Sequence, residues 1–236
     1  MSASTAVVPD LRRGQGRNLA LATLAFAISF WAWNIMAPLG VRYTEQMGLS
    51  AGQKSLLVAI PVLVGSLGRI VTGALTDRFG GRLMFTVLML ASAPFVLLVA
   101  VAGDGGSYGL MLVFGFFLAI AGTTFAVGLP FVTAWFEADR RGFATGVFGA
   151  GMGGTALSAF FTPRLVTWIG YAATHLLIAA ALVVVAATSF AGSSAWVRAL
   201  SSPGSPPHPR SGSAASPASS ARPAAWAASS RPWSWA

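Results

Sequence analysis

The sequence predicts an all-α membrane protein with six transmembrane helices. Of its 236 residues, 55% are hydrophobic and 9% are charged, whereas soluble globular proteins carry about 25% charged residues. The mean hydropathy is +0.71, and the apolar residues gather in long runs that stop near residue 192. This composition excludes an ordinary soluble enzyme, and the absence of cysteine excludes a disulfide scaffold.

Six stretches meet the requirement for a membrane-spanning helix, which is about 20 mostly apolar residues. In chain order they are Asn18–Val41, Leu56–Leu75, Leu83–Ala102, Tyr108–Trp135, Phe143–Pro163 and Tyr171–Gly192. The first is not a cleavable signal peptide, because it is too long, lacks a clear small-residue cleavage site and precedes five more spans. We therefore assign residues 18–192 to a six-helix bundle and residues 1–17 to a basic N-terminal arm.

The distribution of basic residues between the spans predicts the orientation. One side carries seven of them in the N-terminal arm and in two connections: Arg12, Arg13, Arg17, Arg78, Arg82, Arg140 and Arg141. The other side carries three: Arg42, Lys54 and Arg164. Because basic residues favour the cytoplasmic side, both termini are expected in the cytoplasm and the bundle in the inner (plasma) membrane. The pI of 11.6 therefore reflects anchoring charges beside a lipid bilayer and does not predict nucleic acid as a partner.

The segment over residues 193–236 differs in composition from the bundle. It is rich in Ser, Ala and Pro, and it contains four arginines and no acidic residue. Such a segment cannot bury enough apolar surface to offset its chain entropy, so we expect it to be disordered. Its four tryptophans allow contact with a bilayer surface. Alternatively, its composition is that of a GC-rich gene read out of frame.

Arg69 is the one charged residue that lies well inside a predicted span. It precedes the predicted end of that span at Leu75 by six residues, which places its backbone about 9 Å inside the membrane. No span contains an acidic residue, so an anionic substrate could supply the missing counter-ion through two parallel hydrogen bonds. Gly65 and Gly73 share its helix face. The alternative is that Arg69 extends to the headgroups or pairs with Asp77.

The segment over residues 73–82 connects the second and third spans. Its glycines permit a tight turn, and its charges suit a membrane surface, so a generic hairpin is one interpretation. However, the segment resembles the signature loop of the major facilitator superfamily at almost every fixed position. That resemblance implies a role in the inward gate for Gly73, Asp77, Arg78, Gly80 and Arg82.

The fifth span is rich in glycine, including Gly142, Gly146, Gly149, Gly153 and Gly154. Glycines spaced by four residues allow two membrane helices to approach closely, so we expect these residues to serve helix packing.

Three segments extend the resemblance to the nitrate/nitrite porters of this superfamily: residues 61–69, 121–128 and 146–154. The resemblance covers about residues 20–190. It implies that Arg69 binds the planar anion, that Phe125 packs against it, and that the glycine run contributes Gly151 and Met152 to the site. Met152 stands where the family usually has Asn, which removes a polar group from that site.

Other polar and aromatic residues support weaker expectations. Trp31, Trp33 and Asn34 are assigned to the membrane interface rather than to substrate contact, and His175 to a packed position rather than to a proton relay. The sequence contains no metal-ligand cluster, phosphate loop or nucleophile–base pair. We therefore expect neither an enzyme nor a bound cofactor or metal.

Transporters of this superfamily have two six-helix halves with the substrate between them, and this chain resembles the N-terminal half alone. The expected function is secondary transport of nitrate or nitrite, by proton symport or by antiport, with three possibilities for this chain. It is a truncated product that is inactive alone, a half that pairs with a copy of itself or with a second six-helix half, or a non-transporting sensor or scaffold.

Overall fold

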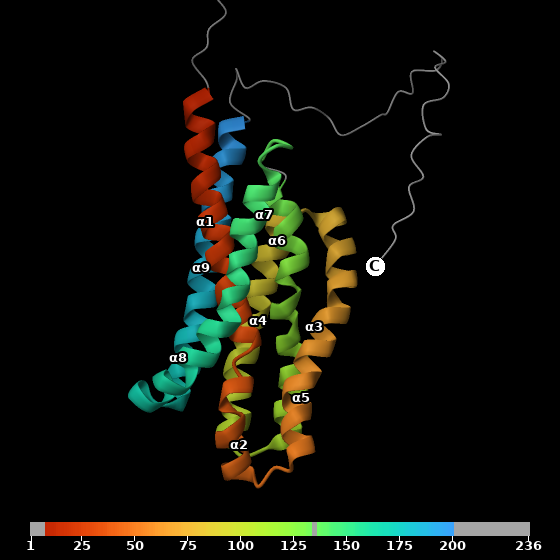
Figure 1. Ribbon diagram of the computed structural model, residues 1–236, viewed down its shortest axis with the longest axis vertical. Coiled ribbons are helices and arrows are strands. Elements are labelled where there is room, and N and C mark those ends of the chain that lie inside the picture. Colours follow the sequence, from red (N-terminus) through yellow and green to blue (C-terminus); the bar gives the residue numbers. More distant parts are fainter. Residues whose placement is uncertain (1–7, 134–135, 201–236) are drawn as a thin grey trace, which may run out of the picture. The chain divides into compact units, whose positions relative to one another are not determined.

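The computed structural model describes residues 8–133 and 136–200, with side chains over residues 15–133 and 136–191. Every regular element in these ranges is a helix. In chain order they are α1 (Val8–Trp33), η1 (Ala37–Leu39), α2 (Gly40–Met47), α3 (Ala51–Phe79), α4 (Gly81–Asp104), α5 (Tyr108–Leu118), η2 (Ala119–Thr123), α6 (Thr124–Thr133), α7 (Arg141–Gly149), η3 (Ala150–Gly153), α8 (Gly154–Ile169) and α9 (Tyr171–Leu200), where η marks 3-10 helix (Figure 1).

The predicted fold class is confirmed, with one difference in the number of membrane spans. Five helical segments are long and apolar enough to cross a membrane: Gln15–Met47, Ala51–Phe79, Gly81–Asp104, Tyr108–Thr133 and Tyr171–Ala191. The predicted fifth span is helical through α7, η3 and α8 but is not among these five. Its many glycines and hydroxyl side chains lower its hydropathy.

Two helices extend beyond the limits that the sequence predicts for the bundle. Helix α1 begins at Val8, so most of the predicted N-terminal arm is helical, because proline is tolerated in a first helical turn. Helix α9 continues to Leu200, beyond the predicted end at Gly192, because residues 193–200 contain neither Gly nor Pro. The rest of the predicted disordered tail, residues 201–236, lies outside the described residues.

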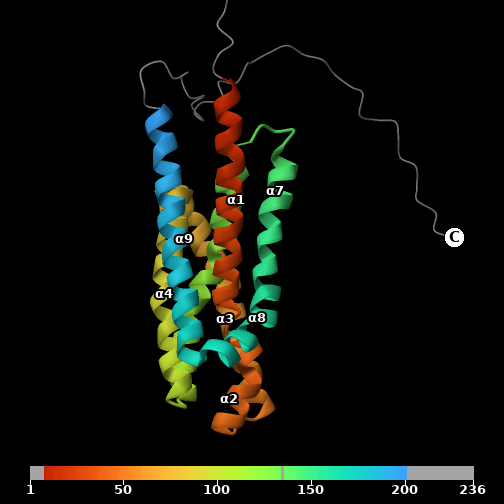
Figure 2. The same cartoon turned by 90° about the vertical axis from the view of Figure 1, so that its left-hand side faces the viewer.

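The core of the bundle lies where α1, α4 and α9 pack side by side, which Figures 1 and 2 show from two directions. The buried side chains there are large and apolar, for example Met89, Ile178 and Leu182. Helix α3 lies at the edge of the bundle: 22% of its most apolar stretch is buried, against 56% for α4. The bundle therefore leaves one face of α3 uncovered by the described part of the chain.

A capping box fixes the start of α3. The Ser50 hydroxyl accepts a hydrogen bond from the Gln53 backbone N–H at 3.2 Å, and the Gln53 side-chain Oε1 accepts one from the Ser50 N–H at 2.9 Å. The two bonds satisfy backbone donors that a helix otherwise leaves unpaired.

Replacing Ser50 with alanine is therefore expected to lower the free energy of unfolding by about 1 kcal/mol. The loss should be visible as a lower midpoint in chemical unfolding of the purified chain in detergent. Ser55→Ala is the matched control, because the Ser55 hydroxyl donates only to the Ala51 carbonyl within the helix. Equal losses in the two variants would contradict the importance of the cap.

Candidate functional site

Arg69 lies in the middle of α3, ten residues before the helix ends at Phe79. Because α3 is longer than predicted, the backbone of Arg69 is about 15 Å from that end rather than 9 Å. The side chain is half-buried, and its Nε donates a hydrogen bond to the Gly122 carbonyl of η2 at 3.3 Å. Its Cζ lies 5.7 Å from the centre of the Phe125 ring of α6. The sequence-predicted pair of Arg69 and Phe125 is thus brought together.

The guanidinium of Arg69 has no carboxylate partner among the described side chains. The one ion pair found there joins Arg42 and Asp104, at the far end of the bundle, with 3.8 Å between Nη2 and Oδ1. Asp77 is exposed and makes no such pair. The Gly122 carbonyl holds Nε, while the two Nη atoms have no hydrogen-bond partner within the described residues. Arg69 therefore presents two parallel N–H donors to an incoming group.

An aromatic cluster forms one wall beside Arg69, and its members come from three helical segments. Phe125 lies 6.3 Å from the ring of Phe148 on α7 and 5.6 Å from that of Phe26 on α1. Phe26 and Phe148 are stacked at 4.6 Å. Phe26 and Phe148 are fully buried, and their close packing holds Phe125 in place beside Arg69.

Trp33 completes the site, although the sequence assigned it to the membrane interface. Its Nε1–H donates to the Pro61 carbonyl of α3 at 3.0 Å. Its ring packs directly on Gly122, where an added Cβ would lie 2.7 Å from the ring. Trp33 thus supports the backbone whose carbonyl holds Arg69. Nothing in the local sequence could have indicated this, because the contacts of Trp33 join segments far apart in the chain.

Trp33→Phe is expected to lower the free energy of unfolding by about 1 kcal/mol, because it removes the hydrogen bond to Pro61. It should also weaken anion binding, since the ring that supports Gly122 changes. Trp31→Phe is the matched control: it removes a bond of similar length, 2.9 Å, to Thr162 on α8. We expect a similar loss of stability in that control, with anion binding unchanged in a titration calorimeter.

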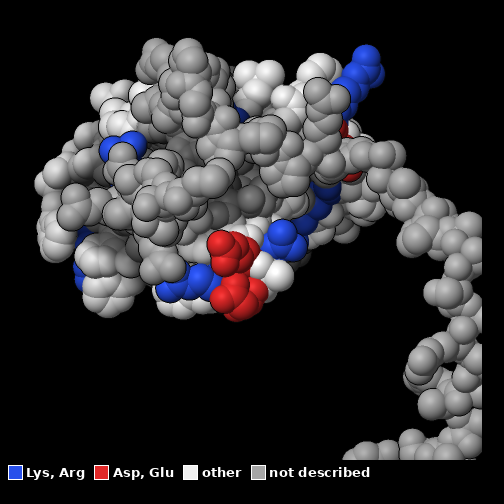
Figure 3. All heavy atoms as spheres, turned by 90° about the horizontal axis from the view of Figure 1, so that it is seen from above, with Lys and Arg blue, Asp and Glu red and all other residues white. Residues whose placement is uncertain are grey.

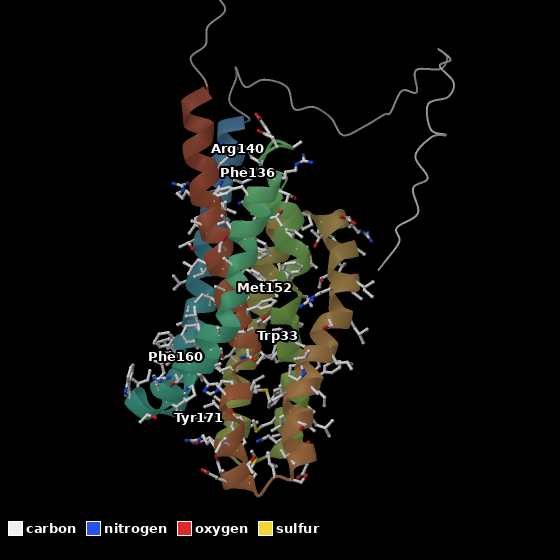
Figure 4. All side chains as sticks on the ribbon, viewed as in Figure 1. Trp33, Phe136, Arg140, Met152, Phe160 and Tyr171 are labelled. Atoms are coloured by element: carbon white, nitrogen blue, oxygen red, sulfur yellow. The ribbon has the colours of Figure 1, made fainter. Side chains whose placement is uncertain are left out.

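The other two predicted substrate contacts lie differently. Gly151 is buried against α1, where an added Cβ would meet the Phe26 ring at 2.5 Å and the Thr23 carbonyl at 2.9 Å. It therefore packs closely against α1, and its contact with the substrate stays a prediction. Met152 is 53% exposed, and Figure 4 places it, like Trp33, in the middle part of the bundle. Met152 thus faces away from the described chain at about the level of the site.

The glycines predicted to pack helices fall into two groups. Gly154 lies directly on the backbone of Ala27 in α1, so no side chain fits there. An added Cβ would meet no described atom within 4 Å at Gly142, Gly146, Gly149 and Gly153. These four have no close packing partner among the described residues, and their role in helix packing stays a prediction. They lie on the side of α7 and η3 that is turned away from α1.

The predicted gate loop is a sharp helix corner. Residues 73–79 belong to α3, and α4 begins at Gly81, so Gly80 alone connects them, with φ +85. Glycine adopts this left-handed conformation at little cost. Arg78 lies over the ring of its neighbour Phe79, and a Cβ added at Gly73 would meet no described atom within 4 Å. Arg82 turns back into the bundle, where its Nη2 donates to the Phe190 carbonyl of α9 at 3.0 Å.

Comparison with known proteins identifies relatives of this chain. The chain matches the Major Facilitator Superfamily over residues 19–235. It is 59% identical over 170 residues to a probable nitrate/nitrite transporter, NarK2 of Mycobacterium tuberculosis, a match that covers 72% of this chain and 43% of the relative. It is 43% identical over 150 residues to a probable nitrate/nitrite antiporter, NarK1 of Thermus thermophilus, covering 64% and 33%.

A third relative is a probable nitrate transporter, NarT of Staphylococcus epidermidis, 37% identical over 166 residues and covering 69% of this chain and 41% of the relative. The chain thus spans less than half the length of the curated relatives it matches.

Proposed function

Because the chain belongs to the Major Facilitator Superfamily, and within it to the nitrate/nitrite porters, we propose that it is one half of a secondary transporter for nitrate or nitrite. In this proposal the anion binds at Arg69, and alternating access arises as the chain rocks against a second six-helix half. The family indicates a multi-pass membrane transporter and not an enzyme.

The main support for the proposal is that the Arg69 guanidinium has no carboxylate partner among the described residues. A buried cation inside a membrane is costly unless something compensates its charge. Arg69 has a backbone carbonyl at Nε and an aromatic face at Phe125, but no carboxylate among the described residues. A planar oxyanion would accept two hydrogen bonds from the free Nη edge and would neutralise the charge.

The open faces of the bundle support the need for a second half. On α3 the most exposed large apolar side chains include Leu63, Leu67 and Ile70, the last of them 75% exposed. On the α7–α8 segment, four glycines and Met152 also face away from the described chain. Helix α3 and the α7–α8 segment are therefore both uncovered beside the site, which suits a partner that packs on them and closes it.

The orientation with both termini in the cytoplasm, in the plasma membrane, is part of the same proposal. It rests on the seven basic residues predicted on one side of the membrane. Figure 3 views the end of the bundle at which α1 begins and α9 ends, and blue side chains are spread around its rim while red ones gather at two places. A cysteine introduced at Ser107 tests this orientation. Labelling of that cysteine only by a reagent added outside intact cells would agree with both termini in the cytoplasm.

Uptake of labelled nitrate into proteoliposomes tests the functional proposal. The chain is reconstituted alone, and also after coexpression with the unmatched half of a full-length relative. Uptake by the chain alone, together with a dimeric mass, would assign the second half to another copy. Uptake only with the added half would identify this chain as a part that needs it. Background uptake in both cases, with the protein folded, would contradict transport and favour the sensor or scaffold.

A further inference from the structure

Arg82 occupies a crevice that neither the anion site nor the uncovered face explains. The residue is half-buried at the start of α4, and its guanidinium lies over the ring of Phe190 on α9, with 4.4 Å between Cζ and the ring centre. Its Nη2 donates a hydrogen bond to the Phe190 carbonyl. Its Nε is buried and has no hydrogen-bond partner among the described residues. An unpaired buried donor on a charged group is costly, so this N–H indicates a missing acceptor.

The crevice beside that N–H is small and has polar groups in its lining. It has a volume of about 20 Å³ and is lined by Arg82 and Thr86 of α4, Asn18 of α1 and Ser189 of α9. The amide of Asn18 has no hydrogen-bond partner among the described residues. A volume of this size admits a single oxygen atom. The crevice therefore suits one oxygen that accepts hydrogen bonds from both Arg82 and Asn18.

The surroundings indicate the charge and the nature of the group that brings this oxygen. Within the described side chains, α1, α4, α6 and α9 contribute no acidic residue to the lining, and the exposed Arg17 precedes Asn18. The rest of the lining is apolar and includes Leu21, Phe85 and Phe131. Asn18, Arg82 and Ser189 each lie within three residues of the end of a predicted span, the level at which we expect the headgroups of a bilayer. Basic side chains beside an apolar lining at that level match an amphiphile with an anionic head.

We propose that this crevice binds one phosphate oxygen of an anionic phospholipid. The oxygen accepts hydrogen bonds from Nε of Arg82 and from the Asn18 amide, and the acyl chains lie along the apolar outer surface. Because Arg82 also contacts α9, the lipid joins α1, α4 and α9. The proposal concerns lipid binding and does not depend on which anion the chain transports.

Native mass spectrometry of the purified chain tests the proposal with three probes: phosphatidylglycerol, phosphatidylcholine and inorganic phosphate. We expect phosphatidylglycerol to be retained in preference to phosphatidylcholine, and inorganic phosphate to leave that preference unchanged. Arg82→Gln should reduce the preference roughly tenfold, because a hydrogen bond to a charged group is lost. Arg78→Gln is the matched control, since Arg78 lies over exposed Phe79 on the same end, and it should retain the preference.

Asn18→Leu is a second variant that leaves the contact between Arg82 and Phe190 in place, so it separates lipid binding from folding. It should also reduce the preference for phosphatidylglycerol. Equal retention of the two lipids by the unmodified chain, or an unchanged preference in Asn18→Leu, would overturn the proposal. Competition by inorganic phosphate at the same site would show instead that the crevice takes a soluble anion, and would also overturn it.

Discussion

Replacing Arg69 with lysine is expected to weaken nitrate binding by roughly tenfold or more, although the positive charge is retained. Lysine offers one ammonium group in place of a planar pair of donors, and it cannot bond the Gly122 carbonyl as Nε of Arg69 does. Arg69→Ala should reduce binding to the background level measured when chloride replaces nitrate in the titration. The measurement is a nitrate titration of the purified chain in nanodiscs.

Arg164→Lys serves as the control for the loss of any guanidinium. Arg164 lies over the Phe160 ring on α8, with its Cζ 3.6 Å from the ring centre, and is exposed. Nitrate affinity should be unchanged in this variant. If Arg69→Lys binds nitrate as tightly as the unmodified chain, the geometry of the guanidinium does not matter and the account of the site is incorrect.

Gly154→Ala is expected to cause the largest loss of stability of any single methyl group added to α8. The added carbon would overlap the backbone of Ala27 on α1, and a backbone cannot rotate away as a side chain can. Overpacking of this kind costs about 1–3 kcal/mol, and we expect the upper part of that range. Thermal unfolding in detergent, followed by circular dichroism, measures the effect.

Gly146→Ala makes the same chemical change eight residues earlier, where no described atom lies within 4 Å of the added carbon. Since alanine favours a helix over glycine, this variant should be as stable as the unmodified chain or slightly more stable. A loss of stability in Gly146→Ala equal to that in Gly154→Ala would show that the close contact between α1 and α8 does not determine the difference.

The sequence was sufficient to predict the membrane fold, and it singled out Arg69 as the candidate anion-binding residue. Long apolar runs require helices in a bilayer. A single arginine inside a span is energetically costly when no span contains an acidic residue to pair with it, so it is easily identified. These are local properties of composition, so they can be read directly. The partner ring Phe125 followed from the family resemblance, and the structure places its ring 5.7 Å from the Cζ of Arg69.

The contacts around Arg69 could not be predicted in the same way. Trp33 lies in α1, and it reaches both Pro61 and Gly122 only because three helices meet at one level. The face that the α7–α8 segment turns toward α1 could not be predicted either, because glycines occur on more than one of its faces. The tighter winding of η3, between those helices, further changes which of them meets α1.

The distance between bound nitrate and the Arg69 guanidinium tests most directly whether the anion binds at Arg69. Solid-state NMR of the chain in lipid, with ¹⁵N-nitrate and ¹³C-labelled arginine, detects an arginine Cζ that lies close to the anion. We expect close dipolar coupling to one arginine Cζ, and we expect it to be lost in Arg69→Lys and kept in Arg164→Lys. Coupling that persists in Arg69→Lys would contradict binding at Arg69, because nitrate would then bind to another arginine.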